Sequence, residues 1–91
     1  MGLYEYEAIV ILEPGIDVNI FRNKIMDLDS IYYFKEWDDM GVKEMAYPIQ
    51  GSWRGHYVRF VFVTLLNDVS YIENSLRMCN EILKFILVKC E

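Results

Sequence analysis

Few side chains in this sequence have the type and spacing that catalysis or metal binding requires. His56 is the single histidine, and it has no partner at metal-ligand spacing. Asp38 and Asp39 are consecutive, so in a strand their carboxylates point to opposite faces. Cys79 and Cys90 also lack ligand spacing, and we expect both to be reduced thiols. With no glycine-rich phosphate loop and no nucleophile elbow, we expect no enzyme, no metal and no cofactor.

Binding chemistry is better represented, because aromatic and basic side chains are plentiful. The 91 residues include 14 acidic and nine basic side chains, for a net charge of −5. That balance argues against a protein that holds nucleic acid through phosphate contacts alone. Residues 1–41 carry three basic and nine acidic side chains, whereas residues 42–91 carry six and five. An anionic partner should therefore meet the second half of the chain.

Two segments carry aromatic side chains that suit a binding surface. Residues 54–61 match the third-strand pattern of RNA-recognition motifs only at their first two positions, although Tyr57 could stack on a base. Four aromatic residues fall in a strand that we expect at the edge of the sheet: Tyr32, Tyr33, Phe34 and Trp37. An edge strand exposes unpaired backbone groups, and interfaces favour Tyr and Trp. We therefore expect a protein partner at this edge.

The elements that must position these residues follow from hydrophobic periodicity. Asp17 and Asp68 are the expected N-caps of two helices, since apolar residues follow each of them at 1, 4, 8 and 11 positions. Residues 42–50 would extend the second strand into a hairpin, with a bulge over residues 38–41 and a turn over residues 51–55. The pattern predicts four strands, over residues 6–12, 31–38, 56–65 and 82–88.

This doubled strand–helix–strand order predicts one α+β domain over residues 1–91. Two short helices bury their apolar faces best on one face of a four-stranded sheet. Right-handed crossovers then give a ferredoxin-like βαββαβ open-faced sandwich with strand order 4-1-3-2. A regulatory module that dimerises and binds a small metabolite would share this fold. Such a module would want a glycine- or asparagine-rich first βα loop, whereas residues 13–16 contain one glycine.

No apolar run approaches the roughly 20 residues that a membrane-spanning helix needs. The first six residues also lack the basic and apolar regions of a signal peptide. We therefore expect a cytoplasmic protein without a membrane partner.

One segment resembles the signature of the bacterial small-subunit ribosomal protein six family. The segment is Gly41-Val42-Lys43-Glu44-Met45-Ala46-Tyr47-Pro48-Ile49-Gln50. The family pattern reads Gly, any residue, basic, polar or charged, Leu, Ala or Ser, Tyr, any residue, Ile, and then usually Lys, Arg, Asn, Ser or Ala. Met45 and Gln50 depart from it. The flanking strands and the closing helix also look like the family's, so the resemblance covers residues 6–89.

The resemblance implies a structural protein of the 30S subunit. Such a protein binds the central domain of 16S ribosomal RNA as a heterodimer with ribosomal protein eighteen, and takes no small-molecule substrate. The residues that the resemblance places near RNA are Tyr6, Lys43, Arg77, Lys84 and Lys89. The residues that we expect at a protein interface are Tyr32, Phe34, Trp37 and Tyr47.

Overall fold

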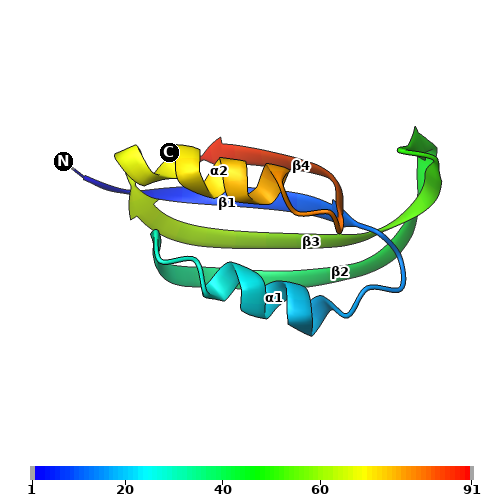
Figure 1. The fold of residues 1–91 in the computed structure, drawn as a ribbon, viewed down its shortest axis with the longest axis horizontal. Helices are drawn as coiled ribbons and strands as arrows, with labels where there is room; N and C mark the ends of the chain where they lie inside the picture. Colours follow the sequence, from blue (N-terminus) through cyan, green and yellow to red (C-terminus); the bar gives the residue numbers. More distant parts are fainter. Residues whose placement is uncertain (1, 91) are drawn as a thin grey trace.

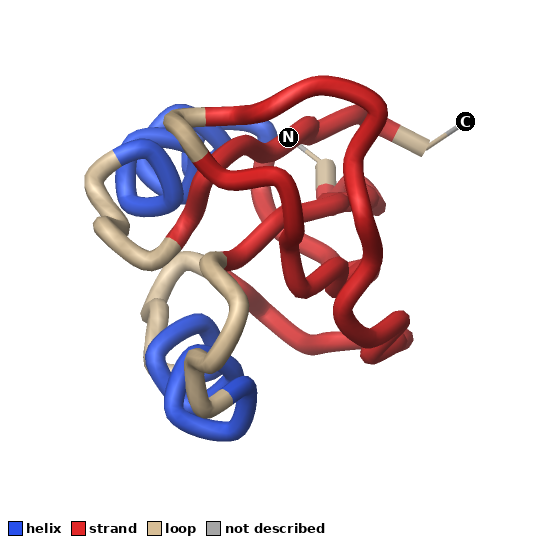
Figure 2. Tube along the Cα trace, turned by 90° about the vertical axis from the view of Figure 1, so that its right-hand side faces the viewer, coloured by secondary structure: helices blue, strands red, loops and turns tan. Residues whose placement is uncertain are grey.

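Residues 2–90 are described by the computed structural model, and they form a four-stranded antiparallel sheet with two helices on one face (Figures 1 and 2). The strand order is β2-β3-β1-β4, so the predicted ferredoxin-like fold and its order 4-1-3-2 are confirmed. In chain order the elements are β1 (Leu3–Leu12), α1 (Val18–Met26), β2 (Ile31–Ile49), β3 (Ser52–Leu65), the short 3-10 helix η1 (Leu66–Asp68), α2 (Val69–Arg77) and β4 (Ile82–Lys89).

The hydrophobic core lies between the helices and the two central strands. Alternate residues of β1 and β3 point toward the helices and are buried: Tyr6, Ala8, Val10, Leu12, Val58, Phe60 and Phe62. Phe21 and Ile25 of α1 and Ile72 and Leu76 of α2 close the core from the other side. These four are the central members of the two predicted helix faces, so the spacing argument is confirmed.

The two predicted helix caps have different outcomes. Asp17 has an extended backbone, and its carboxylate accepts a hydrogen bond of 2.9 Å from the backbone N–H of Asn19, as predicted. Asp68 makes no side-chain cap hydrogen bond, so that prediction is wrong. The chain enters α2 through η1, which leaves Asp68 already helical at φ −93° and ψ −10°. A capping side chain needs an extended backbone at its own residue.

The long hairpin of β2 and β3 turns earlier than predicted. Ile49 pairs with Ser52, so the turn is the two residues Gln50 and Gly51, at φ 49° and 81°, and not residues 51–55. Positive φ at both central residues matches the twist of the flanking strands, which favours this tight turn. Gly55 instead lies within β3, where it pairs with Lys43.

The hairpin bends out of the plane of the sheet. The β2–β3 register shifts at four points, one of them between Asp39 and Gly41, which confirms the predicted bulge. The Asp39 carboxylate accepts hydrogen bonds there from the Gly41 backbone N–H (3.0 Å) and from His56 Nε2 (2.5 Å). Bulges bend and twist a strand. We call residues 42–55 the hairpin arm; it curves up at the right-hand end of the sheet in Figure 1.

Candidate nucleic-acid and protein interface

The open face is the side of the sheet opposite the helices. Residues of β1 and β3 that face it pair across the strands, with Glu7 opposite Val61, Ile9 opposite Arg59 and Ile11 opposite Tyr57. Tyr57, Arg59 and Val61 therefore share this face, because alternate residues of a strand point to the same side. The open face has two halves of different character, one charged and one apolar.

The charged half is internally paired. Arg59 donates hydrogen bonds to the carboxylates of Glu7 and Glu36, the second at 2.9 Å. Lys35 Nζ lies 2.7 Å from the carboxylate of Glu5. The hydrogen bonds to Glu36 and Glu7 raise the pKa of Arg59 above its ordinary value. Both cations in this half are therefore already neutralised by neighbouring carboxylates.

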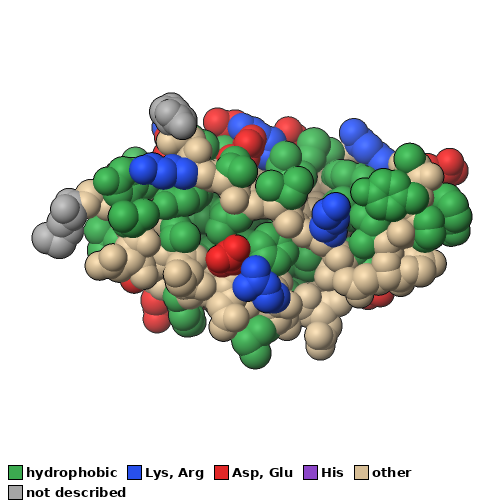
Figure 3. All heavy atoms as spheres, turned by 90° about the horizontal axis from the view of Figure 1, so that it is seen from above, with side chains coloured by type: hydrophobic (Ala, Val, Ile, Leu, Met, Phe, Trp, Pro, Cys, Tyr) green, Lys and Arg blue, Asp and Glu red, His purple; other side chains and the backbone are tan. Residues whose placement is uncertain are grey.

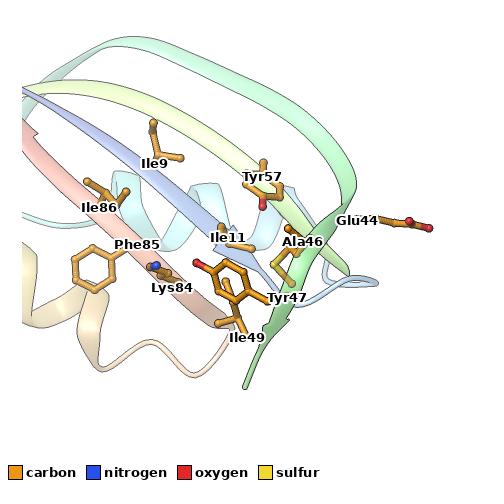
Figure 4. A pocket seen from close by; sticks show the side chains of 11 residues that line it. Ile9, Ile11, Glu44, Ala46, Tyr47, Ile49, Tyr57, Lys84, Phe85 and Ile86 are labelled. Carbon is orange, nitrogen blue, oxygen red and sulfur yellow. The ribbon is translucent and has the colours of Figure 1, made fainter. Parts of the chain in front are cut away.

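The apolar half forms a cup under the hairpin arm. Its lining comes from all four strands, and we define the cup by Ile9, Ile11, Tyr47, Ile49, Tyr57 and Ile86. The hollow has a volume of about 260 Å³. Figure 4 shows Tyr47 and Ile49 of the arm lying over Ile11 and Lys84, while the Glu44 side chain points away. Tyr47 is 60% exposed and Ile86 54% exposed, so apolar surface is open to a partner.

Two lysines lie at the cup, and neither is neutralised. Lys84 is part of the lining, and Lys43 Nζ is 5.9 Å from the centre of the Tyr57 ring. Within residues 2–90, neither ammonium group has a carboxylate at ion-pair distance. The cup therefore combines exposed apolar surface with positive charge.

The arm is fastened to the far edge of the sheet. The Gln50 side chain donates a hydrogen bond of 2.9 Å to the backbone carbonyl of Leu83, next to β4 residue Lys84. The tip of the hairpin formed by the edge strand β2 and its neighbour β3 thus reaches β4 at the other edge of the sheet.

The residues that the family resemblance places near RNA lie in three places. Lys43 and Lys84 belong to the open face. Arg77 and Lys89 lie on the helix side, where the Arg77 guanidinium is 5.9 Å from the Phe85 ring and Lys89 Nζ is 4.0 Å from the Tyr4 ring. Figure 3, which looks down on the β4 side, shows Lys and Arg side chains standing apart from one another with hydrophobic side chains between them.

The fifth of these residues, Tyr6, belongs to the core. Its side chain is 5% exposed, and its ring stacks on Phe62 with the ring centres 6.0 Å apart. Tyr6 therefore packs in the core and does not face solvent. It pairs with Lys89 across β1 and β4, so it helps to hold the strand that carries this lysine.

The four residues expected at a protein interface also lie in different parts of the structure. Tyr32 is 55% exposed on the edge strand β2. Phe34 and Trp37 are half-buried, and the Trp37 ring stacks on Phe60 at 5.2 Å. Tyr47 lies at the cup, with residues that the sequence reasoning did not select, such as Ile9 and Ile86. A signal for Ile9 existed, because residues 8–12 of β1 are apolar on both alternating sets of positions.

The side chains that could have taken part in catalysis make structural hydrogen bonds instead. His56 holds the bulge through Asp39, and its hydrogen bond lowers the pKa of that carboxyl group. Cys79 Sγ donates to Glu81 at 2.9 Å, and burial raises the pKa of the thiol. Among residues 2–90 there is no group of three potential metal ligands, and no helix is long and apolar enough to cross a membrane. Cys79 and Cys90 are both free.

Comparison with known proteins gives consistent matches. The family model described as Ribosomal protein S6 matches residues 5–89. A small ribosomal subunit protein bS6 from Solidesulfovibrio magneticus is 30% identical over 90 residues, covering 93% of this chain and 88% of its own length. The protein of the same name from Nitratidesulfovibrio vulgaris is 36% identical over 90 residues, covering 93% and 89%.

A solved structure supports the fold independently. The crystal structure of 30S ribosomal protein S6 from Thermotoga maritima superposes with a TM-score of 0.80. It covers 98% of this chain and 89% of its own, at 20% sequence identity.

Proposed function

Since this chain belongs to the ribosomal protein S6 family, we infer that it is a structural constituent of the bacterial small ribosomal subunit. The resemblance carried by residues 41–50 is confirmed by the family match over residues 5–89. The family is structural, so the expectation that the chain is no enzyme is also confirmed, and its place is the 30S subunit in the bacterial cytoplasm. The alternative of a metabolite-binding regulatory module gains no support from these matches.

We propose further that the chain binds the central domain of 16S ribosomal RNA as a heterodimer with ribosomal protein eighteen. The observation that carries this proposal is the exposed apolar cup with two lysines beside it that have no ion-pair partner among residues 2–90. Exposed apolar area of this kind marks a site for another macromolecule when it is continuous and bordered by polar groups. In this proposal, apolar side chains of protein eighteen fill the cup, with Tyr47 as the exposed anchor and Tyr32 at the more distant edge.

Lys43 and Lys84 are then the residues at which protein and RNA meet. A partner seated in the cup would cover the apolar lining and leave the ammonium groups beside it. RNA phosphates that pass along the partner would find these two charges unopposed, because they have no carboxylate at ion-pair distance within residues 2–90. The affinity for RNA would therefore depend on the partner being present.

Arg77 and Lys89 provide a second contact to RNA on the helix side of β4. Each cation lies over an aromatic ring, Phe85 or Tyr4, which orders the side chain. Arg77 also pairs with Glu73 at 3.4 Å, but its side chain is 63% exposed, and a long, exposed ion pair of this kind is weak enough for a phosphate to compete with it. Three or four such cations neutralise few phosphates, so we expect a slope of about −3 in log K against log salt rather than about −8. Phe34 and Trp37 support the same sheet from within.

The test is a titration of a central-domain fragment of 16S ribosomal RNA with this protein, with and without ribosomal protein eighteen. We expect weak binding alone and tight binding by the pair. Arg77→Ala combined with Lys89→Ala should weaken RNA binding by the heterodimer. Arg22→Ala combined with Lys35→Ala, which removes two charges near β2, is the matched control. Equal RNA affinity with and without the partner would contradict the proposal.

Protein binding at the cup is tested separately. Tyr47→Ala should lower the affinity for protein eighteen without RNA, and Tyr71→Ala is the control, since Tyr71 is similarly exposed but lies on α2. If the two variants bind protein eighteen equally well, the cup is not its binding site.

A further inference from the structure

Gln50 combines a strained backbone with a long-range side-chain contact. Its φ of 49° lies in the left-handed region, which glycine and asparagine adopt more easily than glutamine. The backbone of the turn therefore gives no reason for glutamine at this position. Its side chain, however, donates a hydrogen bond of 2.9 Å to the carbonyl of Leu83, 33 residues further along the chain.

Leu83 lies at an irregularity in the pairing of β4 with β1. Lys84 pairs with Ile11 and Ile82 pairs with Leu12, so Leu83 has no partner in β1. Leu83 is itself buried. The Gln50 carboxamide gives the Leu83 carbonyl a hydrogen-bond donor at this partly buried place, where an unsatisfied carbonyl would be costly. The same hydrogen bond thus gives the Leu83 carbonyl a partner and joins the tip of the hairpin arm to β4.

This hydrogen bond holds the tip of the hairpin arm, the part of the arm farthest from the bulge around Gly41. The arm leaves the sheet at the bulge around Gly41 and carries Tyr47 and Ile49 over the cup. If its tip is free, the two side chains can move away from Ile11 and Ile86. With the tip held at β4, the cup keeps its shape before a partner arrives.

We propose that Gln50 is a positioning residue that latches the hairpin arm to β4 and preorganises the cup for a protein partner. The second part of this proposal rests on the proposed binding of protein eighteen at the cup. Preorganisation raises affinity, because the apparent dissociation constant increases as the fraction of molecules in the binding-competent shape decreases.

Two variants remove the latch in different ways. Gln50→Glu keeps the length of the side chain but replaces the donor amide by a carboxylate, which cannot donate to Leu83. Gln50→Gly removes the side chain and relaxes the left-handed backbone, so the turn itself should form at least as well as in the wild type. Ser52→Ala is the control, because Ser52 Oγ donates only within the arm, to the carbonyl of Arg54 at 2.7 Å.

The first measurement is amide hydrogen exchange over residues 42–55 in the isolated protein. We expect both Gln50 variants to exchange about two- to tenfold faster in the arm, the range that the loss of one side-chain hydrogen bond allows, with residues of β1 unchanged. Ser52→Ala should exchange like the wild type in β4 and at Tyr47. Unchanged arm exchange in both Gln50 variants would overturn the latch.

The second measurement is the affinity of the full-length chains for purified ribosomal protein eighteen without RNA. Both Gln50 variants should bind about two- to tenfold more weakly, although Gln50→Gly has the better turn. Faster arm exchange with unchanged affinity would overturn the positioning role. A wild-type chain that fails to bind protein eighteen would instead overturn the proposed function, and the positioning role with it.

Discussion

Gly55 is the position where one added methyl group should be costly. It lies in β3 and is buried, and a Cβ atom built on its backbone would come within 2.3 Å of Ile11 Cγ2 on the neighbouring strand β1. Such a separation is far inside van der Waals contact. Ile11 cannot yield easily, because a β-branched side chain has few χ1 rotamers and this one lies in a central strand. We expect Gly55→Ala to lower the free energy of unfolding by about 2 kcal/mol, as overpacking does.

The assay is thermal and urea unfolding of four chains: the wild type, Gly55→Ala, Ile11→Ala and the double variant. For a domain of this size, 2 kcal/mol corresponds to a decrease in Tm of roughly 8–16 °C. Ile11→Ala removes the methyl group that the new Cβ would meet. In that background we therefore expect Gly55→Ala to cost less than about half as much, which the double-mutant cycle reports as a coupling energy.

Two results would refute this reasoning. If Gly55→Ala is within about 0.5 kcal/mol of the wild type, the strands have room for the methyl group. If the cost is the same in both backgrounds, the loss comes from the backbone of Gly55 rather than from contact with Ile11.

Three further predictions concern the helices and the loop before β4. Asp17→Ala should lower the free energy of unfolding by about 1 kcal/mol and Asp68→Ala by clearly less, because only Asp17 caps a helix with its side chain; equal losses in urea unfolding would contradict this. Leu76→Ala should cost roughly 3 kcal/mol, since Leu76 is buried in the core, and a loss below about 1 kcal/mol would mean that the site collapses around the smaller side chain. Hydrogen bonds from Cys79 and Lys24 lower the pKa of Glu81 to about 2. Because the folded-state pKa is depressed, its contribution to stability should be present above pH 4.5 and disappear as the pH falls to about 2. Unfolding of Glu81→Gln across this range should lack that part of the decline, and identical pH profiles would exclude the contribution.

The parts of the fold that could be predicted are those with a local pattern. Phe21 and Leu76 belong to spacings of three and four residues that appear within one helix, and the bulge near Gly41 is marked by its own turn residues. The cap predicted at Asp68 was wrong because Asp is common both in turns and at helix N-caps. The sequence shows the polar residue but not the backbone angles that it adopts.

The cup could not be predicted because it depends on contacts between distant segments. The β2–β3 register shifts at four points, and none of these irregularities is marked in the sequence in a way that indicates where the tip of the hairpin arm will lie. The hydrogen bond from Gln50 to Leu83 joins residues 33 positions apart, with no periodic signal between them. Tyr47 was selected from the sequence, but the sequence did not indicate which side chains it would face.

The pairing of β1 with both β3 and β4 affects how the protein is made. Of the four strands, β1 is synthesised first and lies in the interior of the sheet, and its Tyr6 pairs with Lys89 of β4. At about 5–20 residues per second, the chain between these two residues takes roughly 4–17 s to synthesise. Both edges of β1 lack their partners until β3 has been made, and the edge that pairs with β4 lacks its partner for the whole interval. Unpaired backbone groups on a strand edge can pair with another molecule. This edge of β1 is therefore covered only after β4 has left the exit tunnel of the ribosome that makes it.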